Sequence, residues 1–269
     1  MHFVVGSTGK VGRNVVSGLA SRGLKVRALA RRPDEAGLPP GVEVAPGDLS
    51  DPGSLSELAQ GCESAFLVWP FLSGDGAEAV VAALAGAVPR VVYLSAQPAG
   101  ERPESFWAQV ERAVEGSARE WTMLRPTGFA ANTLGWAGQI RESGVVRWVY
   151  GQAARSLIHE RDIADVAVRA LTEPGHHGRR YVLSGPAAIT QIDQVHAIGA
   201  AIGRPLRWEE VPAGQVEDQL AGIPAGALKT WASFVDAPEV VTQTVAEVTG
   251  TPARSYAQWA RDHAGDFAV

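Results

Sequence analysis

The chain has 269 residues, of which 46% are hydrophobic and 20% are charged, enough for one α/β core with a smaller lobe attached. A net charge of −5 excludes a general nucleic-acid binder, and the single cysteine, Cys62, excludes an intrachain disulfide and a cysteine cluster for zinc. No apolar run approaches the roughly 18 residues of a membrane span, and a strand expected from residue 2 leaves no room for a signal peptide. We therefore expect a cytoplasmic protein without a membrane or nucleic-acid partner.

Short apolar runs alternate with helical patterns through the first half of the chain. Strands are predicted at residues 2–5, 25–30, 42–44, 64–68, 91–95 and 122–125. Helices are predicted between them at residues 11–21, 52–61, 76–86 and 104–118, the second with Asp51 as N-cap. Because strands and helices alternate, the pattern predicts a doubly wound parallel Rossmann sheet with helices on both faces.

After Pro126 the regular alternation of strand and helix patterns ends, and a smaller α/β lobe is expected. Strands are predicted at residues 147–151, 155–160, 179–185 and 206–211. Helices are predicted at 161–171 with Asp162 as N-cap, within 189–203 with Thr190 as N-cap, and at 255–267. We expect a cofactor-binding core over residues 1–130. Residues 131–269 form mainly a substrate lobe in this prediction, with about 156–185 returning to the core.

Three glycines, Gly6, Gly9 and Gly12, follow the first predicted strand in the stretch "GSTGKVG" and precede an amphipathic helix. In a dinucleotide-binding turn the first glycine permits the tight turn, the second lets the backbone approach a pyrophosphate, and the third lets the helix pack closely. The helix N-terminus then offers N–H groups and positive potential to the phosphates. A glycine trio also occurs in structural turns, but this context favours a dinucleotide site, to which we also assign Lys10.

The end of the second strand bears on the choice of cofactor. NAD sites usually carry an acidic residue there, whereas NADP sites favour arginine. This chain has Arg31 and Arg32 at that point, and its first acidic residue is Asp34. A guanidinium forms strong charge-assisted hydrogen bonds with a 2′-phosphate. The sequence therefore predicts NADP(H), and the alternative is that the two arginines are solvated surface charges.

Residues after the third and fourth strands complete the cofactor prediction. Asp48 and Leu49 are expected at the edge and the face of an adenine ring, although Asp48 also suits a plain turn. Val68, Trp69 and Pro70, at the end of the fourth strand, are also expected to contact the cofactor, the last two along the path of the nicotinamide, although Trp69 also suits the core.

The chain resembles the NmrA-like branch of the atypical short-chain dehydrogenase/reductase superfamily. The resemblance lies in "GSTGKVG", "VRALARRP", "GDLSDPGSL", "VVYLSA", "WTMLRPTGFAANT" and further motifs that run in family order to the C-terminus. Members include NADPH-dependent quinone and azo-dye reductases and non-catalytic sensors of the NADP redox state. The resemblance implies further cofactor contacts at Thr8, Val11, Ser95, Ala96, Pro126, Thr127 and Gly128.

The resemblance also implies a substrate pocket at Phe129 and Asn132, to which we add Trp107 and Tyr150. Together with Trp69 and Trp136, Trp107 and Phe129 are candidates for an aromatic wall against a flat acceptor, although aromatic residues more often belong to the core. His159 and Tyr150 are further candidates for carrying a proton, although His159 also suits a structural role beside the expected cap at Asp162. No histidine has the spacing of a metal site with carboxylates.

One departure from typical short-chain dehydrogenases concerns the Tyr-x-x-x-Lys pair, in which the tyrosine passes a proton. The region where it belongs reads "ERPESFWAQVERAVEG" and contains neither residue. An electron-poor acceptor can take hydride without a dedicated acid, so we expect an NADPH-dependent oxidoreductase acting on a small aromatic or conjugated molecule such as a quinone. A redox sensor and a redox-neutral enzyme are the alternatives, and a monomer or homodimer is expected.

Overall fold

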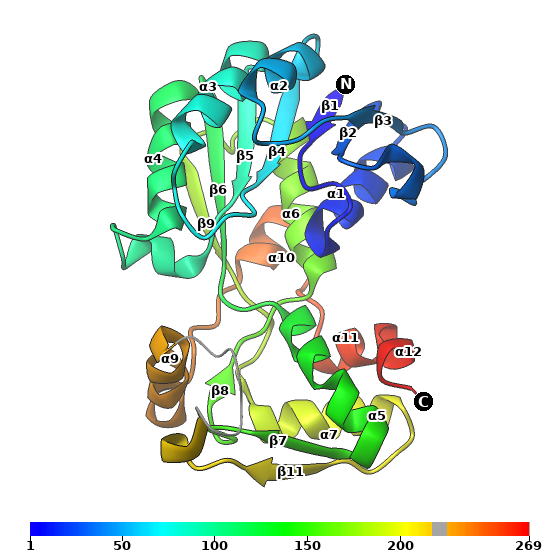
Figure 1. The fold of residues 1–269 in the computed structure, drawn as a ribbon, viewed down its shortest axis with the longest axis vertical. Helices are drawn as coiled ribbons and strands as arrows, with labels where there is room; N and C mark the ends of the chain where they lie inside the picture. The colour runs from blue at the N-terminus through cyan, green and yellow to red at the C-terminus, as the bar shows by residue number, and fades with distance from the viewer. Residues whose placement is uncertain (217–224, 269) are drawn as a thin grey trace. The chain divides into compact units, whose positions relative to one another are not determined.

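A computed structural model describes residues 1–216 and 225–268 (Figure 1). The chain divides into two compact units, which are taken separately below. Unit 1 comprises Met1–Pro126, Glu160–Leu183 and Thr244–Thr251, and unit 2 comprises Thr127–His159, Ser184–Gln243 and Pro252–Val269. The assignment of cofactor to one unit and substrate to the other remains a prediction.

Unit 1 is built on a seven-stranded parallel sheet with strand order β3-β2-β1-β4-β5-β6-β9. The strands are β1 (His2–Val4), β2 (Val26–Ala30), β3 (Glu43–Pro46), β4 (Ser64–Val68), β5 (Arg90–Leu94), β6 (Glu120–Pro126) and β9 (Arg179–Leu183). The order reverses between β1 and β4, the place where ligands bind in open α/β sheets, outside the carboxyl ends of the strands. The predicted doubly wound parallel sheet is confirmed.

Helices cover both faces of this sheet. They are α1 (Lys10–Ser21), α2 (Pro52–Ala59), α3 (Ala77–Ala87), α4 (Phe106–Ser117), α6 (Glu160–Thr172) and α10 (Thr244–Thr249), with 3-10 turns η1 (Pro33–Glu35) and η2 (Gln97–Gly100). On one face α1 and α10 pack against α6, and on the other α2, α3 and α4 pack side by side (Figure 1). The central strands are buried from both sides, which is why they read as continuous apolar runs.

Local capping follows the sequence signals in most places. The Asp51 carboxylate accepts a hydrogen bond of 3.3 Å from the backbone N–H of Ser54 at the start of α2, as predicted. The prediction for Asp162 is wrong, because α6 already begins at Glu160 and Asp162 lies inside its first turn. Cys62 is buried in the core of unit 1.

Unit 2 contains two small sheets and short helices. Strand β7 (Val145–Trp148) pairs in parallel with β11 (Arg207–Glu210), and β8 (Ala154–Arg155) pairs antiparallel with β10 (Ile189–Thr190). The helical elements are η3 (Ala130–Trp136), α5 (Ala137–Ser143), α7 (Gln191–Ala201), η4 (Ala213–Gln215), α9 (Ala225–Asp236), α11 (Tyr256–Asp262) and α12 (Ala264–Phe267).

Three predicted elements of unit 2 have different bounds in the structure, while the cap of α7 is as expected. The Thr190 hydroxyl accepts a hydrogen bond of 3.0 Å from the N–H of Asp193, which confirms that cap. The strand expected at 147–151 ends at Trp148, because Tyr150 has a φ of +57° that an extended strand cannot contain. Of the strand expected at 155–160 only Arg155 lies in a strand, the second residue of β8, and the last helix is divided into α11 and α12.

Over residues 1–216 and 225–268, every helix is too short or too polar to cross a lipid bilayer.

Candidate cofactor site

The glycine turn lies at the carboxyl end of β1, next to the reversal of strand order. Gly6 has a φ of +75°, and a Cβ there would lie 2.8 Å from the Cβ of Val68. A Cβ on Gly12 would lie 2.1 Å from the carbonyl oxygen of Gly6, so only glycine lets α1 approach the turn this closely. The Gly9 N–H closes the turn by donating to the Gly6 carbonyl at 3.0 Å. The first and third glycines thus meet the steric demands expected of a dinucleotide turn.

The N-terminus of α1 carries no negative charge of its own that would repel an anion. Its N-cap is Gly9, no side chain caps it, and its first turn contains no acidic residue. Ser7 ties the turn to β2, because its buried hydroxyl donates to the Leu29 carbonyl at 2.7 Å. The positive end of the helix dipole therefore lies at the glycine turn, where a pyrophosphate would be stabilised. Ser7 was not anticipated from the sequence, since a serine in a glycine-rich turn carries no signal of its own.

A cavity of about 530 Å³ in unit 1 adjoins this turn. It is formed by residues at the carboxyl ends of β1, β2 and β4 and by the loop after β3. Seven of the expected cofactor residues line it: Gly6, Thr8, Arg31, Asp48, Leu49, Val68 and Pro70. Its lining also includes Ser50 and Phe71, which the sequence analysis did not single out. The other expected cofactor residues lie outside this lining: Gly9, Lys10, Val11, Gly12, Arg32, Trp69, Ser95, Ala96, Pro126, Thr127 and Gly128.

The two arginines after β2 differ in their surroundings. Arg31 lines the cavity with an exposed side chain and has no hydrogen bond or ion pair to any described residue. Arg32 is also exposed, but its guanidinium pairs with the Glu35 carboxylate at 2.5 Å. Arg31 therefore presents to the cavity a guanidinium that no described side chain hydrogen-bonds, with the Asp48 carboxylate near enough to interact with its charge.

Asp48 is oriented by a local turn. Its Oδ1 accepts hydrogen bonds from the backbone N–H of Ser50 at 2.8 Å and from the Ser50 hydroxyl at 2.7 Å. These two bonds, with a smaller contribution from the charge of Arg31, lower the pKa of Asp48 below its ordinary value. Asp48 is thus held as a carboxylate at the cavity wall. The D-x-S spacing is the signal that could have identified Ser50.

An aromatic pair follows β4. Trp69 is buried among core side chains and its indole N–H donates to the Ser73 carbonyl at 2.8 Å. Phe71 is 41% exposed, lines the cavity, and meets Trp69 edge to face with ring centroids 5.1 Å apart. Trp69 therefore takes the core position that the sequence left open, and Phe71 presents the aromatic surface at the cavity.

The residues expected at the nicotinamide end fall into both units. Ser95 follows β5 and Pro126 ends β6, so both lie at the carboxyl edge of the unit 1 sheet. The Ser95 hydroxyl donates to the buried Glu111 carboxylate at 2.5 Å. In unit 2, the Thr127 hydroxyl donates to the Ser156 carbonyl at 3.0 Å, and Gly128 lies against the Arg155 guanidinium.

The expected substrate residues are likewise divided. Trp107 in unit 1 is half-buried, and its ring centroid lies 4.2 Å from the ring centroid of Phe106. Phe129, Asn132 and Tyr150 belong to unit 2, where Tyr150 packs beside a small apolar cluster. Trp136 is a buried core residue of unit 2, as in the alternative that the sequence left open. A common substrate pocket for these residues remains a prediction.

His159, the other candidate proton carrier, is buried in unit 2 with its Nε2 3.2 Å from an Asp262 carboxylate oxygen.

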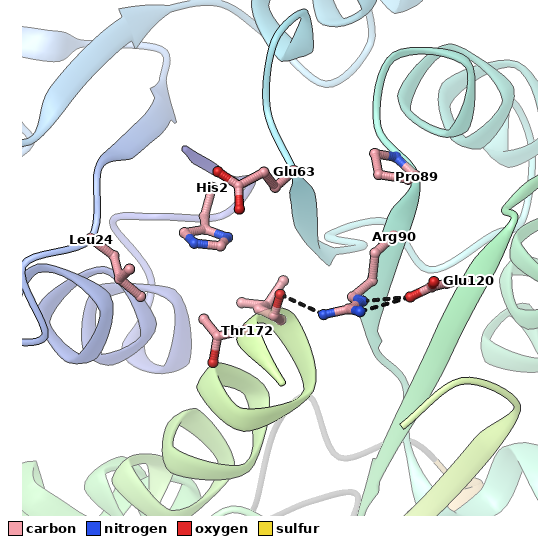
Figure 2. A pocket seen from close by; sticks show the side chains of 8 residues that line it. His2, Leu24, Glu63, Pro89, Arg90, Glu120 and Thr172 are labelled. Atoms are coloured by element: carbon pink, nitrogen blue, oxygen red, sulfur yellow. Dashed lines mark hydrogen bonds and ion pairs between the residues drawn. The ribbon is translucent and has the colours of Figure 1, made fainter. Parts of the chain in front are cut away.

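A second pocket of about 300 Å³ lies at the opposite, amino-terminal edge of the sheet (Figure 2). Figure 2 shows Arg90 between Glu120 and the end of α6; the guanidinium donates to the Glu120 carboxylate at 2.8 Å and to the Leu171 carbonyl at 3.0 Å. The N-terminal ammonium pairs with Glu63 at 2.6 Å. Because the protein's own groups satisfy these charges, the pocket offers much less to a charged ligand than the cavity beside Arg31.

Among the described side chains, no cluster of three or more His, Cys, Asp or Glu residues is arranged to hold a metal ion.

A doubly wound sheet whose first βα turn leaves a glycine-rich helix N-terminus open defines a dinucleotide-binding protein. Comparison with known proteins agrees: residues 6–174 match the NAD(P)H-binding family model, and the chain belongs to this family. It is 39% identical over its whole length to (4-alkanoyl-5-oxo-2,5-dihydrofuran-3-yl)methyl phosphate reductase of Streptomyces griseus, covering 99% of that protein. It is 33% identical to the NAD(P)H azoreductase of Xenophilus azovorans, with 99% of each chain covered.

Solved structures share the fold. A quinone oxidoreductase from Escherichia coli in complex with NADPH superposes with a TM-score of 0.80 at 23% identity, covering 97% of this chain and 99% of that one. The resemblance inferred from the motifs is confirmed. The protein is an NAD(P)H-dependent oxidoreductase of a small molecule, so the prediction of an enzyme is confirmed as well.

Proposed function

We propose that the protein is an NADPH-dependent reductase that transfers hydride to a small, electron-poor conjugated acceptor, such as a quinone or an alkanoyl-substituted 5-oxo-2,5-dihydrofuran. The observation that carries the proposal is the exposed Arg31 guanidinium, which lines the cavity beside the glycine turn and has no partner among the described residues. A 2′-phosphate on the adenosine ribose would supply the hydrogen-bonded anionic partner that the guanidinium lacks, through charge-assisted hydrogen bonds. NADP(H) is therefore favoured over NAD(H).

The rest of the cavity suits the adenosine half of such a cofactor. The pyrophosphate would lie at the open N-terminus of α1, and the adenine between the apolar side chains of Leu49 and Phe71. The second carboxylate oxygen of Asp48 has no donor among the described residues and can accept from the adenine amino group. The reduced nicotinamide, when bound, supplies the hydride.

The choice of acceptor is supported by the tyrosines. Of the four in the chain, Tyr93 and Tyr256 are buried, and burial raises the pKa of both above the ordinary value of a tyrosine. The Tyr181 hydroxyl bonds to His176 at 2.8 Å, and α4 carries neither tyrosine nor lysine. None of these three tyrosines is therefore placed with a lysine as the acid that an isolated ketone needs, and the fourth, Tyr150, belongs to unit 2.

A conjugated acceptor removes that need. Hydride adds to its electron-poor carbon or nitrogen, and the displaced π electrons move to the oxygen or nitrogen at the far end of the conjugated system. That atom then takes a proton from water, which completes a two-electron, two-proton reduction. The names of the relatives, a furanone phosphate reductase and an azoreductase, support acceptors of this kind.

The proposal is tested by mixing the protein with NADPH and a panel of quinones, azo dyes, alkanoyl furanones and simple ketones while nicotinamide absorbance is followed. Turnover of conjugated acceptors with simple ketones inert is expected, and NADPH should be preferred to NADH. Turnover of simple ketones alone would refute the acceptor class. Tight, unequal binding of NADP⁺ and NADPH without any turnover would favour a sensor instead, and a product of unchanged mass would favour a redox-neutral enzyme.

A further inference from the structure

A buried ion pair lies behind the carboxyl end of β5 in unit 1. The Arg125 guanidinium on β6 donates from Nε to Glu111 Oε1 at 2.9 Å and from Nη2 to Glu111 Oε2 at 2.6 Å. The same Oε1 accepts from the Ser95 hydroxyl at 2.5 Å. Gly100 leaves space for the guanidinium, since a Cβ there would lie 2.8 Å from Arg125 Nη1. Three elements, β5, β6 and α4, thus converge on one carboxylate.

This arrangement determines the direction of the Ser95 hydroxyl bond. A guanidinium has only donors, so both Glu111 oxygens that face Arg125 act as acceptors. The Ser95 hydrogen must then point toward Glu111, and the bond is short because its acceptor is charged. Only the lone pairs of Ser95 Oγ remain, so toward any other group this hydroxyl is an acceptor.

A contribution to folding stability does not by itself explain why the chain buries the Glu111–Arg125 ion pair. A buried ion pair costs much of its Coulombic gain in desolvation and is often replaceable by apolar residues without loss. The neighbouring Tyr93 hydroxyl is buried and has no hydrogen-bond partner among the described residues, although the charge of Glu111 is near enough to add to the rise in the pKa of Tyr93. The Glu111 carboxylate therefore accepts hydrogen bonds from Ser95 and Arg125 and none from the Tyr93 hydroxyl.

We propose that Glu111 and Arg125 are positioning residues that make Ser95 Oγ a hydrogen-bond acceptor for the nicotinamide end of the bound cofactor. This inference rests on the proposed function, because it assumes a dinucleotide that extends over the carboxyl end of β5. The group that donates to Ser95 is a ribose hydroxyl or the carboxamide N–H, the two donors that this part of the cofactor carries.

A double-mutant cycle tests the coupling. We expect Ser95→Ala and Glu111→Gln each to weaken NADPH binding in a fluorescence titration by about three- to tenfold, the range for one lost hydrogen bond. Because Glu111 acts through Ser95, the double variant should bind as weakly as Ser95→Ala and no more weakly. Glu115→Gln is the matched control: it lies one turn further along α4, pairs with Arg180, and should leave binding unchanged. Losses that multiply in the double variant would overturn the proposal.

A second measurement covers the case in which Glu111→Gln does not fold, because Ser95→Ala leaves the ion pair intact. The 3-acetylpyridine analogue of NADP lacks the carboxamide N–H but keeps the ribose hydroxyls. If the carboxamide donates, the wild type should bind this analogue about three- to tenfold more weakly than NADP⁺, and Ser95→Ala should not distinguish the two. If a ribose hydroxyl donates, Ser95→Ala should weaken both cofactors equally. Wild-type affinity of Ser95→Ala for both cofactors would overturn the proposal.

Failure of the positioning role can be told apart from failure of the proposed function. If the wild type binds neither NADPH nor NADP⁺, the proposed function itself is wrong. If it binds NADPH with the dependence on Arg31 described below but Ser95→Ala has no effect, only the positioning role is wrong.

Discussion

Replacement of Arg31 by alanine tests whether its positive charge favours NADPH over NADH. The side chain is exposed and has no partner among the described residues, so its removal should not change the melting temperature. A charge-assisted hydrogen bond contributes about 1.5–3 kcal/mol. Solvent and salt screening at this exposed position reduce the expected loss to about 1–2 kcal/mol. NADPH should therefore bind about 5- to 30-fold more weakly to Arg31→Ala, while NADH, which lacks the 2′-phosphate, should bind as before.

Calorimetric titration of both cofactors at low and high salt measures this difference. The loss for NADPH should shrink as salt increases, because screening weakens the wild-type contact. Arg31→Lys should bind with intermediate affinity, since it keeps the charge without the paired donors. Arg22→Ala, at the other end of α1, is the control and should bind both cofactors normally. Equal loss of NADPH and NADH in Arg31→Ala, or no loss of either, would refute the assignment.

Three further predictions concern the turn, the cavity wall and the opposite edge of the sheet. Gly12→Ala should lower stability by about 2 kcal/mol or more in thermal denaturation, because its Cβ would meet the Gly6 carbonyl at 2.1 Å; Gly86→Ala in α3, which meets no atom within 4 Å, should not. Phe71→Ala should weaken NADPH binding about three- to tenfold with an unchanged melting temperature, and an unaffected affinity would remove Phe71 from the adenine site. Burial, and then the N-terminal ammonium, lower the pKa of His2 below its ordinary 6.5. As pH falls below 6.5 the unfolded chain takes up a proton that the folded protein does not, so stability should decrease; His2→Gln should flatten this dependence in urea denaturation from pH 8 to pH 5, and identical slopes would contradict it.

Several features of unit 1 follow from short-range signals alone. The alternation of apolar runs and helical patterns implies parallel strands with crossover helices, because no other arrangement buries both faces of such strands. The steric demand on Gly12 comes from Gly6, six residues earlier, and the Asp51 cap is satisfied within three residues, as is the Thr190 cap in unit 2. Such interactions depend little on the rest of the molecule, so the residues themselves reveal them.

Other features involve residues far apart in the chain, and the sequence carries no local signal for them. Trp69 and Phe71 suit core and cavity equally well by type, and the packing after β4 buries the first and exposes the second. Ser95, Glu111 and Arg125 lie 14 and 16 residues apart and meet only because β5, α4 and β6 converge.

By itself, the sequence determined the parallel architecture, the glycine turn and the basic residues that follow the second strand, since each of these depends on neighbours within a few residues. Only the tertiary structure decided that Arg31 stands free while Arg32 is paired, and that Thr244–Thr251 returns to unit 1. It also decided that the Ser95 hydroxyl donates its hydrogen to the buried Glu111 carboxylate, which leaves its oxygen as an acceptor. The physical reason is that burial and ion pairing depend on the full set of atoms around a group, which local propensity does not specify.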